Sequence, residues 1–482
     1  MPVLTLWQGS RRREIPFEEG ACLGDLLRVH APGHAHPCGG RGVCGKCQAL
    51  LRGQEKPVLS CQTYLTDQDT EVFLPETLAI SQVAMTGKKV EIHKTTGKVG
   101  AAVDIGTTTV VLALYDLEKG YCLAEKAMLN PQTSIAADVI GRMEAAIKGS
   151  LELERQLILS AIETLEDAAC RDAGVDREQV QSRVITGNTT MLYLLTGRDP
   201  VSLSRAPFEA DTLFDQEIPW KDGTAYLPGC MNAFVGADIT CAVLESGMCE
   251  GMETALLCDL GTNGELALWK DGRLYVTSTA AGPVFEGACI SCGVNSVPGA
   301  IDCVWAEDGE VRVHTIDERE AVGLCGSGLM DAIAALLEIE ELDEAGSLET
   351  DPYPLAPAVR LSQADIRAVQ LAKAAIYAGV MTLLRAAECR AEDVAHFYVA
   401  GGFGSHARME SAAKIGMLPE ALAKKAQVLG NAALRGAVRL LIQQDERQKA
   451  RDIAASAVHV ALGGNAWFND AYIEAMMFPA QE

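Results

Sequence analysis

The chain has 482 residues, of which 48% are hydrophobic and 22% charged, and its formal net charge is −24. A chain of this length can build a large core in about two to four domains, and its acidity argues against a nucleic-acid binder, which needs a basic face. No apolar run approaches the roughly 18 residues of a membrane span, so we expect a cytoplasmic protein with neither nucleic-acid nor membrane partners.

Residues 1–78 have a character of their own. PVLTLWQG and RRREIPF predict a strand pair, GACLGDLLRVH a short helix and TEVFLP a closing strand. A glycine-rich loop between them contains Cys38, Cys44 and Cys47, and Cys61 follows in VLSCQTYL. The glycines let the backbone wrap closely around inorganic sulfide. The segment resembles a 2Fe–2S ferredoxin domain of the β-grasp type, with these four thiolates as the ligands of the cluster.

The alternative for these cysteines is a structural zinc site. Zinc sites usually pair their cysteines as CxxC knuckles, and this segment has one such pair. With sixteen cysteines in an expected cytoplasmic chain, metal ligation or buried thiols are favoured over disulfides. Cys22 groups with the apolar face of the expected helix, and we assign it to the core.

Residues 79–99 are expected to form a linker, and a strand–turn–strand follows at AAVDIGTTTVVLALYD. Such a turn exposes N–H groups and hydroxyls that can cradle phosphate, and the carboxylate before it can hold Mg²⁺ through water. A second copy, LLCDLGTNGELALWKDGRLYV, lies about 155 residues further on, which suggests two similar lobes with a nucleotide between them. The two copies place in these roles Asp104, Gly106, Thr107, Thr108, Asp259, Gly261, Thr262 and Asn263.

Between the two hairpins, helices are expected over Asn130–Ile147 and Leu151–Arg171. Asn188 follows a buried strand and opens a further helix, a position that suits either phosphate contact or a plain helix cap. Asp238 lies near the start of another helix. Its carboxylate can orient an attacking water or simply cap the helix, and both interpretations stay open.

The second half contains two more glycine-rich turns. Gly326 and Ser327 open a helix that we expect to run from Leu329 to Glu338, and another helix is expected from Ser362 to Glu388. Glycines directly after an apolar strand allow the close approach of a base and ribose, and here they are Gly401, Gly402 and Gly404. Cys289 and Cys292 are interpreted as buried or incidental thiols.

DIGTTT, GNTT, DLGTNGE, GLCGSG and VAGGFG occur in the order of the actin, sugar-kinase and heat-shock ATPase superfamily. Residues 100–482 resemble that superfamily, which implies an α/β fold of two ribonuclease-H-like lobes, 100–252 and 253–482, whose C-terminal segment returns toward the first lobe. Together with NPQ…ADVIGR, AGPVFEGA and IGMLP, the chain resembles the reductive activators of corrinoid proteins. Better-known members have a sizeable extra domain where this chain has only the linker, which leaves open how the partner docks.

This resemblance implies an ATPase dimer that receives electrons from an external low-potential donor and returns a Co(II) corrinoid protein to Co(I). Asp104 and Asp259 would then handle Mg²⁺ and water with Asp238, the two turns would hold the phosphates of ATP, and the later glycines the adenosine. Two alternatives remain: an activator of the 2-hydroxyacyl-CoA dehydratase type, which would give Cys289 and Cys292 a role, and a non-catalytic ATP-binding redox sensor.

The cluster assignment is tested by single substitutions. Replacing Cys38, Cys44, Cys47 or Cys61 by alanine should abolish or severely distort the 2Fe–2S absorption spectrum, because each thiolate is one of four iron ligands. The control Cys22→Ala should leave the spectrum intact. Loss of the cluster in that control would show that a different set of four cysteines binds it.

Overall fold

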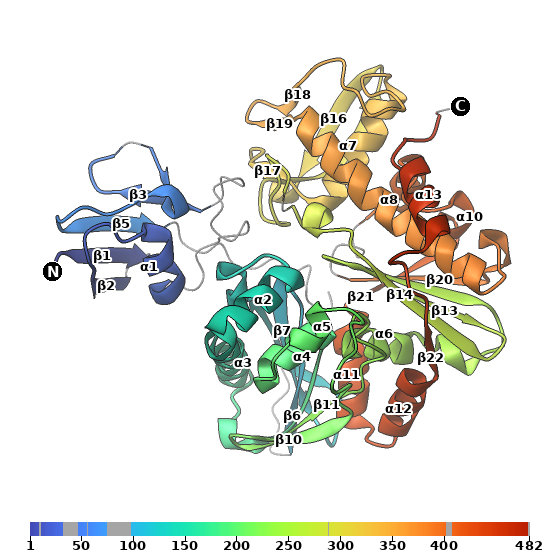
Figure 1. Ribbon diagram of the computed structural model, residues 1–482, viewed down its shortest axis with the longest axis horizontal. Helices are drawn as coiled ribbons and strands as arrows, with labels where there is room; N and C mark the ends of the chain where they lie inside the picture. Colours follow the sequence, from blue (N-terminus) through green and yellow to red (C-terminus); the bar gives the residue numbers. More distant parts are fainter. Residues whose placement is uncertain are drawn as a thin grey trace.

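The computed structural model describes residues 1–8, 11–31, 47–54, 56–74, 98–287, 289–401 and 407–480. Figure 1 shows a small N-terminal sheet beside two larger lobes. The N-terminal sheet has the order β2-β1-β5-β3-β4, with β1 and β5 parallel, which is the strand order of a β-grasp sheet. Its elements are β1 (Val3–Gln8), β2 (Arg11–Pro16), α1 (Leu23–His30), β3 (Gln48–Leu51), β4 (Val58–Leu59), the short helix η1 (Ser60–Gln62) and β5 (Thr70–Leu74).

The first large lobe is built on a six-stranded sheet of order β10-β11-β9-β6-β7-β8. Three antiparallel strands come first in the chain, and β9 then joins the free edge of β6 in parallel. The predicted hairpin of the first phosphate turn is confirmed as β6 and β7. The strands are β6 (Val99–Ile105), β7 (Thr109–Asp116), β8 (Cys122–Leu129), β9 (Val180–Gly187), β10 (Gln216–Trp220) and β11 (Gly223–Leu227).

The second lobe repeats this plan with the order β21-β20-β12-β13-β14-β22. Again three antiparallel strands come first, and a later strand, β20, joins the free edge of β12 in parallel. The duplicated α/β architecture expected from the two hairpins is therefore present. The strands are β12 (Ala255–Leu260), β13 (Gly264–Lys270), β14 (Arg273–Thr279), β20 (His396–Ala400), β21 (Ala426–Gly430) and β22 (Ala457–His459).

Helices cover both faces of each sheet. In the first lobe, α3 lies against β7 and β8, whereas α11 from the C-terminal part of the chain lies on β6 and β9 beside α6 (Figure 1). Alternate residues of β6 point to these two layers, so Val103 joins the α3 side and Ala102 the α6 side. The helices of this lobe are α2 (Val139–Ala145), α3 (Leu151–Ala173), α4 (Thr189–Thr196), α5 (Val201–Ser204) and α6 (Ala237–Ser246).

The second lobe adds two small sheets and the remaining helices. They are β15 (Ala300–Glu307), β16 (Glu310–Thr315), β17 (Gly323–Leu324), β18 (Tyr353–Ala356), β19 (Val359–Leu361), α7 (Gly326–Glu338), α8 (Gln363–Ala386), α9 (Met409–Lys414), α10 (Glu420–Ala423), α11 (Ala432–Ile442), α12 (Glu446–Ser456) and α13 (Ala466–Glu474). Helix α8 alone among the described helices is long and apolar enough to cross a membrane, but 72% of its most apolar stretch is buried inside the protein. It is a core helix of this lobe.

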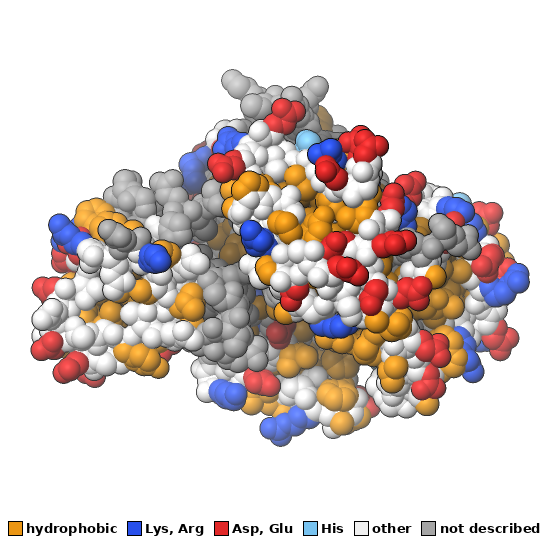
Figure 2. Space-filling view, turned by 90° about the horizontal axis from the view of Figure 1, so that it is seen from above, with side chains coloured by type: hydrophobic (Ala, Val, Ile, Leu, Met, Phe, Trp, Pro, Cys, Tyr) orange, Lys and Arg blue, Asp and Glu red, His pale blue; other side chains and the backbone are white. Residues whose placement is uncertain are grey.

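Charged side chains are scattered over the face of the molecule seen in Figure 2, between hydrophobic and uncharged ones. Figure 2 shows acidic side chains scattered among basic ones over one face. Over the whole sequence, Asp and Glu number 65 and Lys and Arg 41, which gives the net charge of −24.

Two predicted helices differ from the structure. The expected helix over Asn130–Ile147 is instead a short helix η3 (Pro131–Ser134) followed by α2. Two separate caps cause the break, because Asn130 accepts from the N–H of Gln132 and Asp138 accepts from that of Gly141. Helix α7 begins three residues before the expected Leu329, at Gly326, so the glycine-rich stretch forms its first turn. Gly328 in this turn packs closely on β15, since a Cβ there would lie 2.2 Å from the carbonyl oxygen of Ile301.

The C-terminal segment is attached to α8 through a buried lysine. Lys373 Nζ donates to the carbonyl oxygens of Ala475 and Met477, each at 2.6 Å, directly after α13. The same ammonium lies 4.9 Å from the ring centre of Phe478. A cation is favourable at this end of a helix because the last carbonyls have no partners inside the helix.

Replacing Lys373 by methionine should lower the free energy of unfolding by about 1–3 kcal/mol, because two carbonyls lose a charged donor that is itself buried. Urea unfolding measures the change, and limited proteolysis should cut the C-terminal segment faster. The control Lys414→Met removes a half-exposed pair with Glu338 and should cost less than about 1 kcal/mol. Equal losses in the two variants would contradict this role for Lys373.

Candidate functional site

The two repeated aspartates occupy equivalent places in the two sheets. Asp104 is the next-to-last residue of β6 and lies opposite Thr186 of β9, and Asp259 is the next-to-last residue of β12 and lies opposite Ala400 of β20. Each carboxylate therefore stands at the carboxyl end of its strand, beside the end of a parallel neighbour. Open α/β sheets bind ligands at this end of their strands.

Burial and mutual repulsion perturb both aspartates. Burial, followed by the charge of Asp238, raises the pKa of Asp104 to about 7, and the amide of Asn431, which donates to its Oδ2 at 3.1 Å, opposes the shift. Burial and the charges of Asp238, Asp104 and Glu286 raise the pKa of Asp259 to about 8. Carboxylates that disfavour one another's ionisation share one confined space.

Asp238 completes this group from the first turn of α6. Its pKa is raised to about 6 by burial, whereas the N–H of Ile239, which donates to Oδ1 at 2.8 Å, lowers it. Gly236 explains the close fit of this turn, since a Cβ there would lie 2.4 Å from the Cα of Asn188. The structure thus brings the predicted Asp104, Asp238 and Asp259 together.

Buried side chains donate hydrogen bonds to the backbone carbonyl oxygens of the first phosphate turn. Arg142 donates to the carbonyl oxygen of Thr107 at 2.6 Å, and Asn130 donates to that of Gly106 at 2.9 Å. Asn188 donates to the Thr107 hydroxyl at 3.3 Å while it caps α4. The cap interpretation of Asn188 is confirmed, since its oxygen accepts from the N–H of Met191, and the phosphate contact stays a prediction.

A carboxylate joins the turns of the two lobes. Glu286 ends the short helix η7 (Pro283–Glu286), and its Oε2 accepts from Thr108 Oγ1 at 2.6 Å and from Thr262 Oγ1 at 2.8 Å. Burial raises the pKa of Glu286, and the two hydroxyls and the charge of Arg142 lower it. The predicted phosphate turns of the two lobes thus share one hydrogen-bond acceptor.

The other predicted residues differ in their surroundings. Gly401 has a φ of +91°, and a Cβ there would lie 2.6 Å from Asp259 Oδ1, so a glycine is needed beside the aspartate. Ser327 donates to the carbonyl oxygen of Asp302 at 3.0 Å, and the nucleotide contact expected of Gly326 and Ser327 stays a prediction. Gly402 and Gly404 lie outside the described residues.

The remaining residues of the second turn lie near the same carboxylates. Gly261 lies beside Glu286, with an added Cβ 3.8 Å from Oε1. Asn263 forms a side-chain hydrogen bond to Glu265. Burial and the charges of Asp238 and Asp259 raise the pKa of Glu265. Within the described part of the chain, no three His, Cys, Asp or Glu side chains are placed to hold a metal ion directly.

Two of the four predicted cluster ligands are close together in the N-terminal sheet. The Sγ atoms of Cys47, just before β3, and Cys61, in η1, are 3.2 Å apart. Cys22 precedes α1 rather than lying on its apolar face, and its thiol contacts the carbonyl oxygens of Ser60 and Cys61. Cys38 and Cys44 lie outside the described residues.

Sequence analysis did not assign Glu286, Asn431 or Arg142. Glu286 lies in the motif AGPVFEGA and Arg142 in ADVIGR, but neither motif indicates which partner its charged side chain meets. Asn431 could have been found, because a glycine and an asparagine follow a strand and open a helix twice, at Gly187–Asn188 and at Gly430–Asn431.

The fold and this site define an ATPase of the actin, sugar-kinase and heat-shock type, with acidic side chains between duplicated lobes. Family models described as "RACo middle region" and "C-terminal domain of RACo the ASKHA domain" match residues 99–251 and 253–482. The chain belongs to the family of reductive activators of corrinoid proteins.

Individual relatives agree. The chain is 32% identical over 417 residues to "Corrinoid activation enzyme RamQ" of Eubacterium limosum, covering 79% of this chain and 70% of the relative. It is 25% identical over 415 residues to "[Co(II) methylated amine-specific corrinoid protein] reductase" of Methanosarcina barkeri, covering 78% and 76%. A solved "Reductive activator for corrinoid,iron-sulfur protein" superposes with a TM-score of 0.75 and 25% identity over 100% of this chain and 99% of that one.

The raised pKa of Asp259 predicts a specific pH dependence of stability. Its pKa is about 8 in the folded protein against an ordinary 3.8, so the unfolded chain releases this proton first and stability falls as pH rises from about 4 to about 8. Asp259→Asn removes this penalty and should be more stable than the parent at pH 8, by up to about 5 kcal/mol. Denaturation in the presence of a chelator at pH 4, 6 and 8 measures the effect.

The difference between parent and variant should shrink toward pH 4, where both folded and unfolded Asp259 bind the proton. Glu318→Asn, on an exposed segment of the second lobe, is the control and should show no such trend. A variant that is less stable than the parent at pH 8 would contradict the repulsion described here.

Proposed function

We propose that this protein uses ATP to return a Co(II) corrinoid protein to Co(I), passing one electron from a 2Fe–2S cluster to the cobalt. An external low-potential donor would reduce the cluster again, and the protein would act as a dimer. The observation that supports this proposal best is the convergence of Asp104, Asp238 and Asp259 between the lobes of a chain that belongs to this family. The two curated relatives carry names that state corrinoid activation and Co(II) reduction.

The carboxylates fit a Mg²⁺–nucleotide. A divalent cation, when bound, neutralises phosphate charge during hydrolysis. Asp104 and Asp259 would hold its water ligands, since no three described carboxylates are placed to bind a metal ion directly. Thr107, Thr108 and Thr262 would donate to phosphate oxygens, and Asp238 would orient the attacking water.

The thiols fit an iron–sulfur cluster. The Sγ atoms of Cys47 and Cys61 are 3.2 Å apart, close enough that a small adjustment would let both bind one iron. Burial of Cys47 keeps water from that side of the site. When bound, such a cluster supplies a one-electron centre. In plant-type ferredoxins the potential of this centre is about −400 mV.

The redox step explains why an ATPase accompanies the cluster. Corrinoid Co(II)/Co(I) couples lie below the potential of such a cluster, and each shortfall of about 59 mV costs a factor of ten in a one-electron equilibrium. ATP binding and hydrolysis offset this cost if the open and closed lobes differ in affinity for the corrinoid protein. The nucleotide would then act by moving the lobes.

Two variants of the full-length protein should separate the two activities. Cys61→Ala should retain ATP hydrolysis but lose cobalt reduction, because the electron path is interrupted. Asp259→Asn should retain the cluster spectrum but lower ATP hydrolysis about 100-fold, because a charge that stabilises the transition state is gone. Anaerobic assays with a corrinoid protein measure the Co(I) absorbance band and phosphate release in parallel.

The matched control for the thiol is Cys22→Ala, which should reduce cobalt as the parent does. ADP should not replace ATP in the parent protein. A redox sensor would bind ATP without steady turnover or any change in cobalt absorbance, and that result would overturn the proposed activity. ATP-dependent activation of a 2-hydroxyacyl-CoA dehydratase, without any formation of Co(I), would favour the alternative activator.

A further inference from the structure

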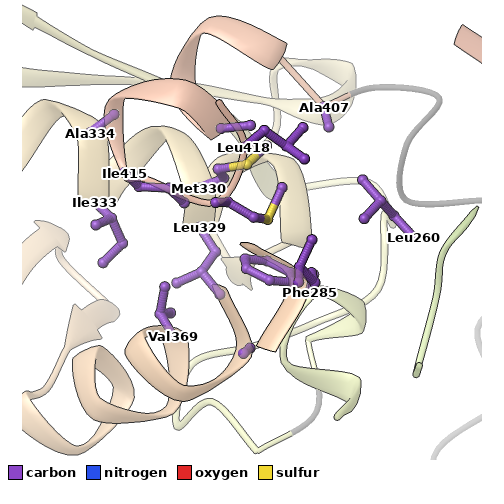
Figure 3. Close-up of a cluster of buried hydrophobic side chains, with 14 of the residues drawn as sticks. Leu260, Phe285, Leu329, Met330, Ile333, Ala334, Val369, Ala407, Ile415 and Leu418 are labelled. Atoms are coloured by element: carbon purple, nitrogen blue, oxygen red, sulfur yellow. The ribbon is translucent and has the colours of Figure 1, made fainter. Parts of the chain in front are cut away.

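Glu286 belongs to the second lobe but contacts the first. Its neighbours in η7, Val284 and Phe285, are buried in the core of the second lobe together with Leu260, Leu329 and Met330 (Figure 3). Thr108 is 178 positions away in the chain, in the turn that ends β6. The hydrogen bond between Thr108 and Glu286 therefore spans the two lobes, whereas the one from Thr262 stays within the second lobe.

The two hydroxyls are already used by the chain. Each threonine has a single O–H donor, so a hydroxyl that donates to Glu286 is not available to a phosphate oxygen. A carboxylate also resembles a phosphate chemically, since both are oxyanions that accept short, charge-assisted hydrogen bonds. Glu286 and a nucleotide phosphate are thus competitors for the same donors.

Electrostatics point in the same direction. Arg142, whose guanidinium holds the first turn, attracts Glu286 across the lobes. A phosphate placed beside Thr108 would repel the Glu286 carboxylate and reduce the attraction that holds the lobes together. Binding of phosphate and bridging by Glu286 are therefore mutually unfavourable.

We propose that Glu286 is an internal clasp that joins the phosphate turns of the two lobes, and that a nucleoside triphosphate must displace it from Thr108 to bind. This inference rests on the proposed ATP site and adds a means of regulation to it. The clasp makes ATP binding weaker than the donors alone would allow, and it couples the arrival of phosphate to the release of one lobe from the other.

The test compares full-length variants in two measurements. Glu286→Ala removes the competitor and should lower the Kd for Mg–ATP about tenfold, because the charge-assisted hydrogen bond from Thr108 no longer has to be broken. Without nucleotide, the same variant should exchange the amide hydrogens of residues 106–109 faster. Glu286→Gln keeps the shape and one acceptor oxygen without the charge, so its Kd and exchange rates should lie between those of the parent and of Glu286→Ala. It replaces the alanine variant if that variant folds poorly.

Two further variants isolate the mechanism. Glu265→Gln removes one buried negative charge from the same group of carboxylates without touching the threonines, so it should tighten ATP binding much less than Glu286→Ala. Thr108→Val combined with Glu286→Ala should lose the gain in affinity, because the donor that was freed is now missing.

Unchanged or weaker ATP binding in Glu286→Ala, or an equal gain in Glu265→Gln, would overturn the clasp. Unchanged hydrogen exchange at residues 106–109 would also overturn it. Absence of ATP binding in the parent would instead overturn the proposed function and the competition with it, while faster exchange in Glu286→Ala would still identify the bridge between the lobes.

Discussion

Helix α6 packs against both central sheets, and this shared layer determines where the site residues lie. Cys241 and Leu244 of α6 belong to the core of the first lobe, whereas Ala242 and Val243 pack against the sheet of the second. A helix held on two sides cannot rotate or slide freely, because each shift would open a void against one sheet. Asp238 lies in the first turn of this helix and is therefore fixed between the two sheets, where it meets the aspartates at the ends of β6 and β12.

The same arrangement forces like charges together. Burial removes water from the carboxylates, and each one raises the pKa of its neighbours, which is unfavourable for the isolated protein. The Asn431 amide, the two threonine hydroxyls and the buried Arg142 cation relieve only part of this cost. Sites that violate the rules of stability in this way are typical of functional positions, where a bound ligand supplies the missing charge. The group consists of Asp104, Asp238, Asp259, Glu265 and Glu286.

Local patterns in the sequence predicted the hairpins, their aspartates and the duplicated fold, because a turn and its flanking strands are encoded by adjacent residues. The interlobe contacts could not be predicted in this way. Thr108 and Glu286 are 178 positions apart, and Asp104 and Asn431 are 327 apart. The break before α2 was missed for a different reason: Asn130 and Asp138 each look like the start of a helix, and periodicity does not reveal that both act as caps.

The two faces of α6 differ in a way that bears on lobe movement. On the first-lobe side α6 is locked to α11, since a Cβ at Gly436 would lie 2.0 Å from the carbonyl oxygen of Cys241. On the second-lobe side it shares a core cluster with large and small side chains of the sheet, among them Leu257, Leu274 and Ala267. Because α6 is held to α11 on one side, a movement of one lobe against the other would leave α6 with the first lobe and change its contacts with the second sheet. Such a movement carries Asp259 and Glu286 past Asp104 and Thr108 together, because η7 and β12 share the core of the second lobe. Contacts made by a phosphate between the turns would thereby be converted into a displacement of one whole lobe.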